Sequence, residues 1–92
     1  MQTTLLRKEN ESIEVEGFTV TITRIGAGHV MLKSVYSDTG VPRASSMVPY
    51  GYPFRLTSNC LIKFNYCPPE HVKLHIATDD GVTVIPGVRH AA

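Results

Sequence analysis

FTVTITRI, at residues 18–25, alternates apolar side chains with threonines. Phe18, Val20 and Ile22 occupy one set of alternate positions, and the threonines occupy the other. Because successive side chains of a β-strand point to opposite faces, this spacing predicts a strand with one buried and one solvent-facing side. The same alternation recurs in four other short segments. The sequence therefore predicts a mainly β protein: a small single-domain antiparallel β-sheet or meander, packed as a thin sandwich or half-barrel.

Strand patterns separated by glycine-containing turns set the expected order of elements. We expect strands at residues 3–7, 12–16, 18–25, 29–36, 61–66, 71–77 and 82–85, with the first four forming a meander. After Ile22 the alternation is interrupted, because Arg24 takes the next apolar position and Ile25 follows it. A β-bulge near Thr23 and Arg24 would account for this and would turn the arginine outward.

Residues 37–55 interrupt the regular pattern with two glycines and three prolines. They predict one long irregular loop with at most a short helical turn near residues 44–48. Loops of this length in a small domain are uncommon and are usually either functional or mobile. The loop carries aromatic and arginine side chains, which are typical interface anchors: Arg43, Tyr50, Tyr52, Phe54 and Arg55. In the alternative, the aromatic rings fold back and close one end of the sheet.

The chain has 92 residues, the length of a single domain with a thin core and little room for a deep pocket. We treat residues 1–92 as one β-rich binding domain with a short C-terminal tail at residues 86–92. The net charge of +1 hides a basic middle segment, because residues 17–69 hold five Lys and Arg against one Asp. A basic field attracts phosphate groups or acidic protein surfaces. Scattered cations that only keep the protein in solution are the alternative.

The alternation in residues 61–66 and 71–77 predicts a polar ledge, formed by the outward side chains of these two strands. If Ile62, Phe64 and Tyr66 point inward in one strand, and the apolar residues of 71–77 point inward in the other, the residues between them point outward. The outward residues are Lys63, Asn65, His71, Lys73 and His75. Lysine binds phosphate as a point charge, and Asn or His reads base edges, so the ledge suits RNA or an acidic protein groove. An ordinary solvated pair of strands has the same pattern.

Catalytic and metal-binding patterns are missing from the sequence. No serine lies in a nucleophile elbow, and no glycine-rich stretch has the spacing of a nucleotide-binding loop. Cys60, Cys67, His71 and His75 suggest zinc, but histidines four apart on a strand lie roughly 13 Å from each other. We therefore expect no enzyme activity, no cofactor, no metal and no small-molecule substrate.

The first residues do not resemble a signal peptide, because acidic residues follow Leu6 almost at once. No apolar run approaches the roughly 20 residues that cross a bilayer. We therefore expect a cytoplasmic protein with no membrane partner. In that compartment two cysteines favour free thiols over a disulfide framework.

LRKENESI, at residues 6–13, is followed by a series of apolar residues and one glycine. These are Val15, Val20, Ile22, Ile25, Gly28, Val30 and Leu32. Over residues 5–33 the chain resembles the opening of the carbon storage regulator family, small RNA-binding β-proteins of bacteria. In that family the first strand and its basic residue lie beside the RNA-binding edge, so the resemblance implies an RNA contact for Arg7, with Lys8 as a second candidate. An RNA-binding translational regulator is therefore one of two leading hypotheses.

The chain as a whole resembles phage anti-CRISPR proteins in its length, β-rich plan, lack of catalytic groups and basic, aromatic-bearing segment. The likeness is to the eighth family directed against the type I-F surveillance complex. It implies a non-enzymatic inhibitor that docks on the crRNA-guided complex in the host bacterial cytoplasm, contacts protein subunits and guide RNA, and blocks target DNA hybridisation. A plain structural interaction domain is the third hypothesis. The candidate contacts for RNA or partner are Arg7, Arg24, Lys33, Arg43, Tyr50, Tyr52, Arg55, Lys63 and Lys73.

Overall fold

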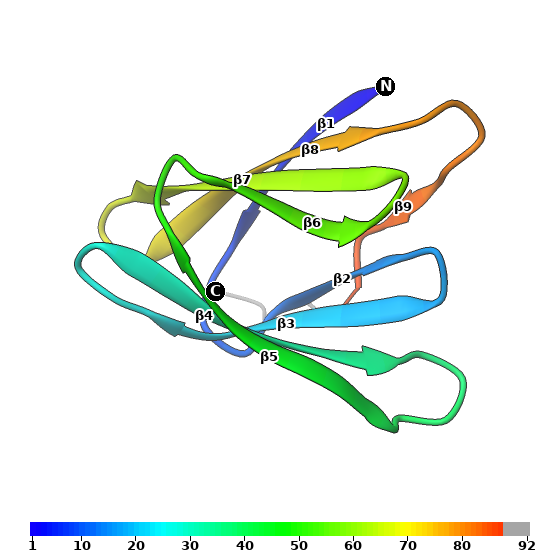
Figure 1. The fold of residues 1–92 in the computed structure, drawn as a ribbon. Helices are drawn as coiled ribbons and strands as arrows, with labels where there is room; N and C mark the ends of the chain where they lie inside the picture. The colour runs from blue at the N-terminus through cyan, green and yellow to red at the C-terminus, as the bar shows by residue number, and fades with distance from the viewer. Residues whose placement is uncertain (88–92) are drawn as a thin grey trace.

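Nine β-strands make up the regular secondary structure of residues 1–87, the part of the chain that this computed structural model describes. They are β1 (Gln2–Arg7), β2 (Ser12–Val15), β3 (Phe18–Ile25), β4 (His29–Tyr36), β5 (Pro42–Pro49), β6 (Pro53–Thr57), β7 (Cys60–Cys67), β8 (His71–Thr78) and β9 (Val84–Ile85). One sheet has the order β1-β8-β7-β6 and the other has the order β5-β4-β3-β2-β9. Figure 1 shows them as two layers, with the four-stranded sheet in the upper part of the view. The mainly β sandwich predicted from the sequence is confirmed. Among the described residues there is no helix that could cross a membrane.

The predicted meander of the first four strands is wrong at its first member. β2, β3, β4 and β5 do follow one another as antiparallel neighbours, but β1 pairs with β8 in the other sheet. In the β1–β8 register Leu5 lies opposite Leu74, so Leu5 packs against the core beside the inward side chains of β8. Residues 8–11 therefore carry the chain from one layer to the other instead of making a hairpin.

The prediction of a long irregular loop at residues 37–55 is also wrong. β5 occupies eight residues of this segment and β6 begins at Pro53, so only short turns remain at residues 37–41 and 50–52. β5 is the edge strand of its sheet, where a proline that lacks an N–H need not remove a ladder hydrogen bond. Pro42 and Pro49 therefore mark the ends of a strand, and residues 44–48 are extended instead of helical.

The β-bulge predicted near Thr23 and Arg24 is confirmed. The register between β3 and β4 shifts after Ile22, which lies opposite Leu32, and resumes at Arg24, which lies opposite Met31. The extra residue turns the arginine to the outer face of the sheet, where it is exposed.

The core lies between the two layers and takes the alternate, apolar residues of the central strands. Seven buried residues come from the five-stranded sheet and seven from the four-stranded sheet. They are Ile13, Val15, Val20, Ile22, Val30, Leu32 and Val48, and Leu56, Cys60, Ile62, Phe64, Val72, Leu74 and Ile76. Tyr66 departs from the predicted inward set. It is 46% exposed at the end of β7, where its ring lies 6.1 Å from that of Tyr50.

Polar side chains tie the two layers together at their margins. Glu16, in the turn after β2, accepts hydrogen bonds from the Thr57 hydroxyl and, at 3.2 Å, from Asn59 Nδ2. Both bonds favour the charged carboxylate and so lower the pKa of Glu16 below its ordinary value. Arg43 joins β5 to β6, because its guanidinium donates to the Leu56 carbonyl at 2.9 Å. The same guanidinium lies 4.4 Å from the centre of the Phe18 ring on β3.

Candidate nucleic-acid interface

Three of the predicted contact residues lie together on the outer face of the four-stranded sheet. Arg55 on β6, Lys63 on β7 and Lys73 on β8 alternate with buried core residues and so point away from the core. In the β7–β8 register Lys63 lies opposite His75, and Lys73 lies opposite Asn65. We name this group the cationic face; its residues are Arg55, Lys63, Asn65, His71, Lys73 and His75.

The cationic face has no neutralising carboxylate within its strands. None of the outward positions of β1, β6, β7 and β8 is Asp or Glu. Those positions are Gln2, Thr4, Leu6, Pro53, Arg55, Leu61, Lys63, Asn65, Cys67, His71, Lys73, His75 and Ala77. The acidic residues next to these strands along the chain are Glu70 in the β7–β8 turn and Asp79 and Asp80 after β8. The centre of the sheet therefore presents positive charge to any ligand laid across it.

The cations at the centre of this face are not engaged inside the protein. Within residues 1–87 the side chains of Lys63 and Lys73 make no ion pair or hydrogen bond. Arg55 makes one exposed bond, in which Nη1 donates to the Ser58 carbonyl at 3.2 Å. Diagonal neighbours on adjacent strands lie about 7–8 Å apart, so the two lysines are close enough to contact neighbouring groups of one anionic chain.

A shallow hollow lies on the same face between β1, β7 and β8. It has a volume of about 390 Å³ and is lined by Gln2, Leu61, Lys63, His75 and Ala77. The apolar side chains of Leu61 and Ala77 are flanked by polar ends that donate or accept hydrogen bonds.

Arg24 and Lys33 lie on the opposite side of the molecule from the cationic face. Both are exposed on the outer face of the five-stranded sheet, Arg24 on β3 and Lys33 on β4. The structure therefore divides the predicted contact residues between two faces. Sequence alone gave no basis for this division, because it does not show which strands share a sheet.

Arg7 is not on a surface, and the RNA contact implied for it is wrong. Its side chain is 1% exposed. The guanidinium donates to the carbonyls of Leu6 at 2.7 Å, Ser12 at 3.0 Å and Pro86 at 3.2 Å. Because β1 lies in one layer and β2 and β9 in the other, these bonds hold the layer crossing and the segment after β9 together. Gly87 lies against the Ser12 carbonyl that accepts from Arg7, because a Cβ added at Gly87 would come within 2.6 Å of Ser12 O. Positions 88–92 of the predicted tail lie outside the described residues.

The aromatic and arginine residues of the predicted loop are used differently from one another. Arg43 bridges β5 and β6 within the protein. Tyr50 and Phe54 pack against the core, as the alternative interpretation predicted, and Tyr50 Oη donates to the Gly26 carbonyl at 2.7 Å. Burial, with a smaller contribution from Tyr66, raises the pKa of Tyr50. Tyr52 is 64% exposed and is the one tyrosine of this segment that is open to a partner.

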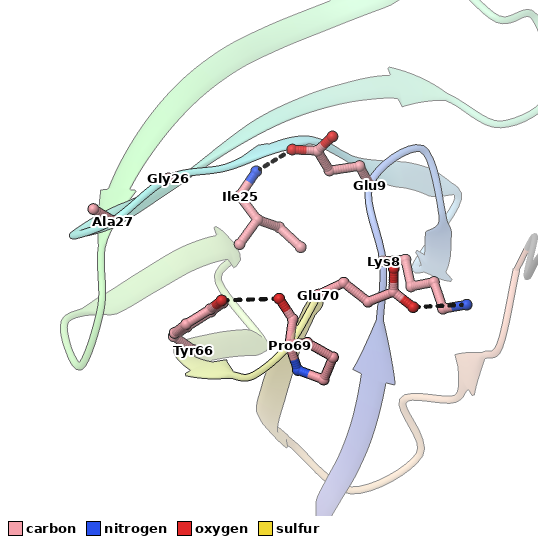
Figure 2. A pocket seen from close by; sticks show the side chains of 8 residues that line it. All are labelled: Lys8, Glu9, Ile25, Gly26, Ala27, Tyr66, Pro69 and Glu70. Carbon is pink, nitrogen blue, oxygen red and sulfur yellow. Dashed lines mark hydrogen bonds and ion pairs between the residues drawn. The ribbon is translucent and has the colours of Figure 1, made fainter.

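A cleft of about 690 Å³ lies at one end of the sandwich (Figure 2). It is lined by Lys8, Glu9, Ile25, Gly26, Ala27, Tyr66, Pro69 and Glu70. Its polar side chains are tied to neighbouring groups. Lys8 pairs with Glu70 at 3.4 Å, Glu9 accepts a hydrogen bond from the Ile25 N–H, and the Tyr66 hydroxyl donates to the Pro69 carbonyl. Figure 2 marks these three interactions with dashed lines. This arrangement has no exposed nucleophile beside a base.

The two cysteines are free thiols at opposite ends of β7. Cys60 is buried, and this burial, with a smaller contribution from the Glu16 charge, raises the pKa of its thiol to about 11. Cys67 lies opposite His71 at the other end of the β7–β8 pair. Within residues 1–87 no three His, Cys, Asp or Glu side chains are placed to hold a metal ion.

Two elements of the interface were missed by the sequence analysis. Gln2 and Leu61 line the hollow beside Lys63, but Gln2 reaches that position only through the β1–β8 pairing, which no local pattern indicates. Leu61 could have been found from the sequence, because the same alternation that exposes Lys63 sets Leu61 outward.

Comparisons with protein-family models, with curated proteins and with solved structures found no match for this chain.

Proposed function

We propose that the chain is a non-enzymatic inhibitor that docks on the crRNA-guided type I-F surveillance complex in the bacterial cytoplasm. In this proposal it contacts guide RNA and protein subunits and blocks hybridisation of target DNA. The observation that carries it is the cationic face, in which Arg55, Lys63 and Lys73 share one side of a sheet with no carboxylate between them. The choice of this complex as the target rests on the resemblance to anti-CRISPR proteins.

The cationic face suits an RNA backbone for electrostatic reasons. Each lysine that neutralises a phosphate releases condensed counterions, which gives affinity without reading the sequence. Asn65 and His75, beside the lysines, supply groups that hydrogen-bond to base edges or to the 2′-hydroxyl. A protein held across a guide RNA in this way excludes the DNA strand that must pair with the same bases.

The sandwich supports inhibition by occupancy without chemistry. Both sheets share one core, so the cations are carried on a scaffold that need not reorganise on binding. The cleft side chains that carry polar groups are engaged with other parts of the protein. Binding, and not turnover, is therefore the activity that we assign.

The test uses the purified type I-F complex and measures its binding to target DNA in the presence of the protein. We expect the wild-type protein to prevent DNA binding, and Lys63→Ala/Lys73→Ala to inhibit at least tenfold less well. The matched control is Thr39→Glu/Thr83→Glu, which lowers the net charge equally at exposed residues outside β7 and β8. Failure of the wild-type protein to bind the complex, or full inhibition by the lysine variant, would contradict the proposal.

An RNA-binding translational regulator is the second candidate, because the same cationic face and hollow fit a free RNA hairpin. The two functions differ in what they bind alone. A regulator shifts free hairpin RNA with a steep salt dependence, whereas an inhibitor of the assembled complex leaves free RNA unbound at physiological salt. A charge-reversal scan that left every partner unaffected would favour a structural interaction domain instead.

A further inference from the structure

The outer face of the five-stranded sheet has a composition different from that of the cationic face. In the registers of β3, β4 and β5, Arg24 lies opposite Met31, and Met31 lies opposite Met47. The adjacent row contains Thr21, Lys33 and Ser45 in the same order. We name these residues the methionine patch: Thr21, Arg24, Met31, Lys33, Ser45 and Met47.

The apolar part of this patch is open to solvent. Met47 is 62% exposed, although its neighbour Val48 is buried in the core. Met31 is partly exposed beside it, so two flexible thioether side chains lie side by side on adjacent strands. Methionine is enriched at protein–protein interfaces, because its unbranched side chain adapts to the shape of a partner.

The charge of this face is also unlike that of a surface built for a polyanion. It carries two cations, Arg24 and Lys33, and one carboxylate, Glu14, which is outward on β2 opposite Thr19. Within residues 1–87 the Arg24 and Lys33 side chains make no ion pair or hydrogen bond. Arg24 lies opposite Met31 on β3, and Lys33 follows Met31 by two residues on β4, so both cations lie next to the apolar part of the patch.

We propose that the methionine patch docks on an acidic protein surface that presents an apolar side chain between its carboxylates. This inference rests on the proposed function and deepens it, because it assigns RNA to the cationic face and a protein subunit to the opposite face. The partner's carboxylates pair with Arg24 and Lys33, and its apolar side chain packs between Met31 and Met47. The affinity for this surface depends less steeply on salt than the affinity for RNA does, because fewer ions are displaced and apolar area is buried.

The test places a benzophenone amino acid at Met47 in one variant and at Lys63 in another, and irradiates each while it is bound to the intact type I-F complex. We expect the Met47 position to give a protein adduct that survives nuclease, and the Lys63 position to give an adduct that nuclease removes. An RNA adduct at Met47, or no adduct there while the complex is bound, would overturn the inference and leave the proposed function standing. Absence of binding by the wild-type protein would overturn both.

A second pair of variants gives a further readout. We expect Met31→Ala/Met47→Ala, which removes apolar contact area and no charge, to weaken binding to the intact complex at least tenfold while leaving the salt dependence of binding unchanged. Lys63→Ala/Lys73→Ala is the comparison, and it lowers the salt dependence as well as the affinity. Circular dichroism confirms that each variant is folded. Equal salt dependence in the two variants would contradict the assignment of different partners to the two faces.

Discussion

The carboxylate of Glu16 accepts a hydrogen bond from the hydroxyl of Thr57, and this bond joins the turn after β2 to the end of β6 across the two layers. The geometry of the turn between β2 and β3 points the Glu16 carboxylate toward Thr57. Glu16 and Gly17 both have positive φ, 51° and 82°, as the two central residues of a type I′ hairpin require. A local turn between β2 and β3 therefore also connects the sheets.

The hydrogen bonds that the Glu16 carboxylate accepts from Thr57 and Asn59 predict a pH-dependent contribution to stability. The folded state lowers the pKa of this carboxyl, so its stabilising effect is present above the ordinary pKa of glutamate and is lost as the pH falls through the lower, folded-state value. We expect Glu16→Gln to lower the melting temperature at pH 7 and to lose this effect in acid. Glu14→Gln, two residues earlier, is the control. A constant difference in melting temperature from pH 7 to pH 2.5 would contradict this account.

The two thiols predict different reactivity. The thiolate is the reactive form of cysteine. The Cys60 thiol has a pKa raised to about 11, so it is almost entirely protonated near neutral pH, and it is also buried. We expect a thiol reagent at pH 8 to modify one cysteine in the folded protein and two in guanidinium. Cys67→Ser is expected to remove the fast reaction, which identifies Cys67 as the accessible thiol. Fast modification of folded Cys67→Ser would show that β7 opens readily at Cys60.

The burial of Arg7 predicts a structural effect of its replacement. A lysine at this position carries one ammonium group and cannot reach the carbonyls of Leu6, Ser12 and Pro86 together. Since a hydrogen bond to a charged group contributes about 1.5–3 kcal/mol, we expect Arg7→Lys to lower the free energy of unfolding by at least that amount. The affinity of the folded fraction for its partner is expected to stay unchanged. A loss of affinity without a loss of stability would restore Arg7 as a contact residue.

The alternation of buried and exposed residues in β7 predicts different effects on stability when the neighbours Ile62 and Lys63 are each replaced by alanine. Ile62 is fully buried between the sheets, and its truncation leaves a cavity, so Ile62→Ala is expected to cost about 2–5 kcal/mol in urea unfolding. Lys63 is exposed, so Lys63→Ala is expected to change stability by about 0.5 kcal/mol or less. A destabilising Lys63→Ala would mean that its effect on binding cannot be read as loss of a contact.

Local patterns carried most of the strand assignment. The alternation of residues 18–25 and 29–36 gives β3 and β4 with the boundaries that the structure has, and the interruption at Arg24 gives the bulge. The same rule sets Lys63 and Lys73 outward. β5 was missed because its prolines lie at the ends of an edge strand, where they are tolerated, and sequence does not show which strand is at an edge.

Long-range pairing set the rest of the candidate site. β1 joins β8 across most of the chain length, and this pairing places Gln2 beside the Lys63 hollow. The burial of Arg7 depends on the carbonyl of Pro86, which is 79 positions away. No periodicity or turn signal reports such a distance, so the division of the cations between two faces required the fold.

The salt dependence of binding to the guide-RNA complex tests the central claim, that the cationic face binds RNA phosphates, most directly. Each phosphate contact on single-stranded RNA adds about 0.7 to the slope of log affinity against log salt. We predict that Lys63→Ala/Lys73→Ala lowers this slope by about 1.4, for two lost contacts, while the net-charge control Thr39→Glu/Thr83→Glu leaves it unchanged. An identical slope for the wild-type protein and the lysine variant would contradict the account.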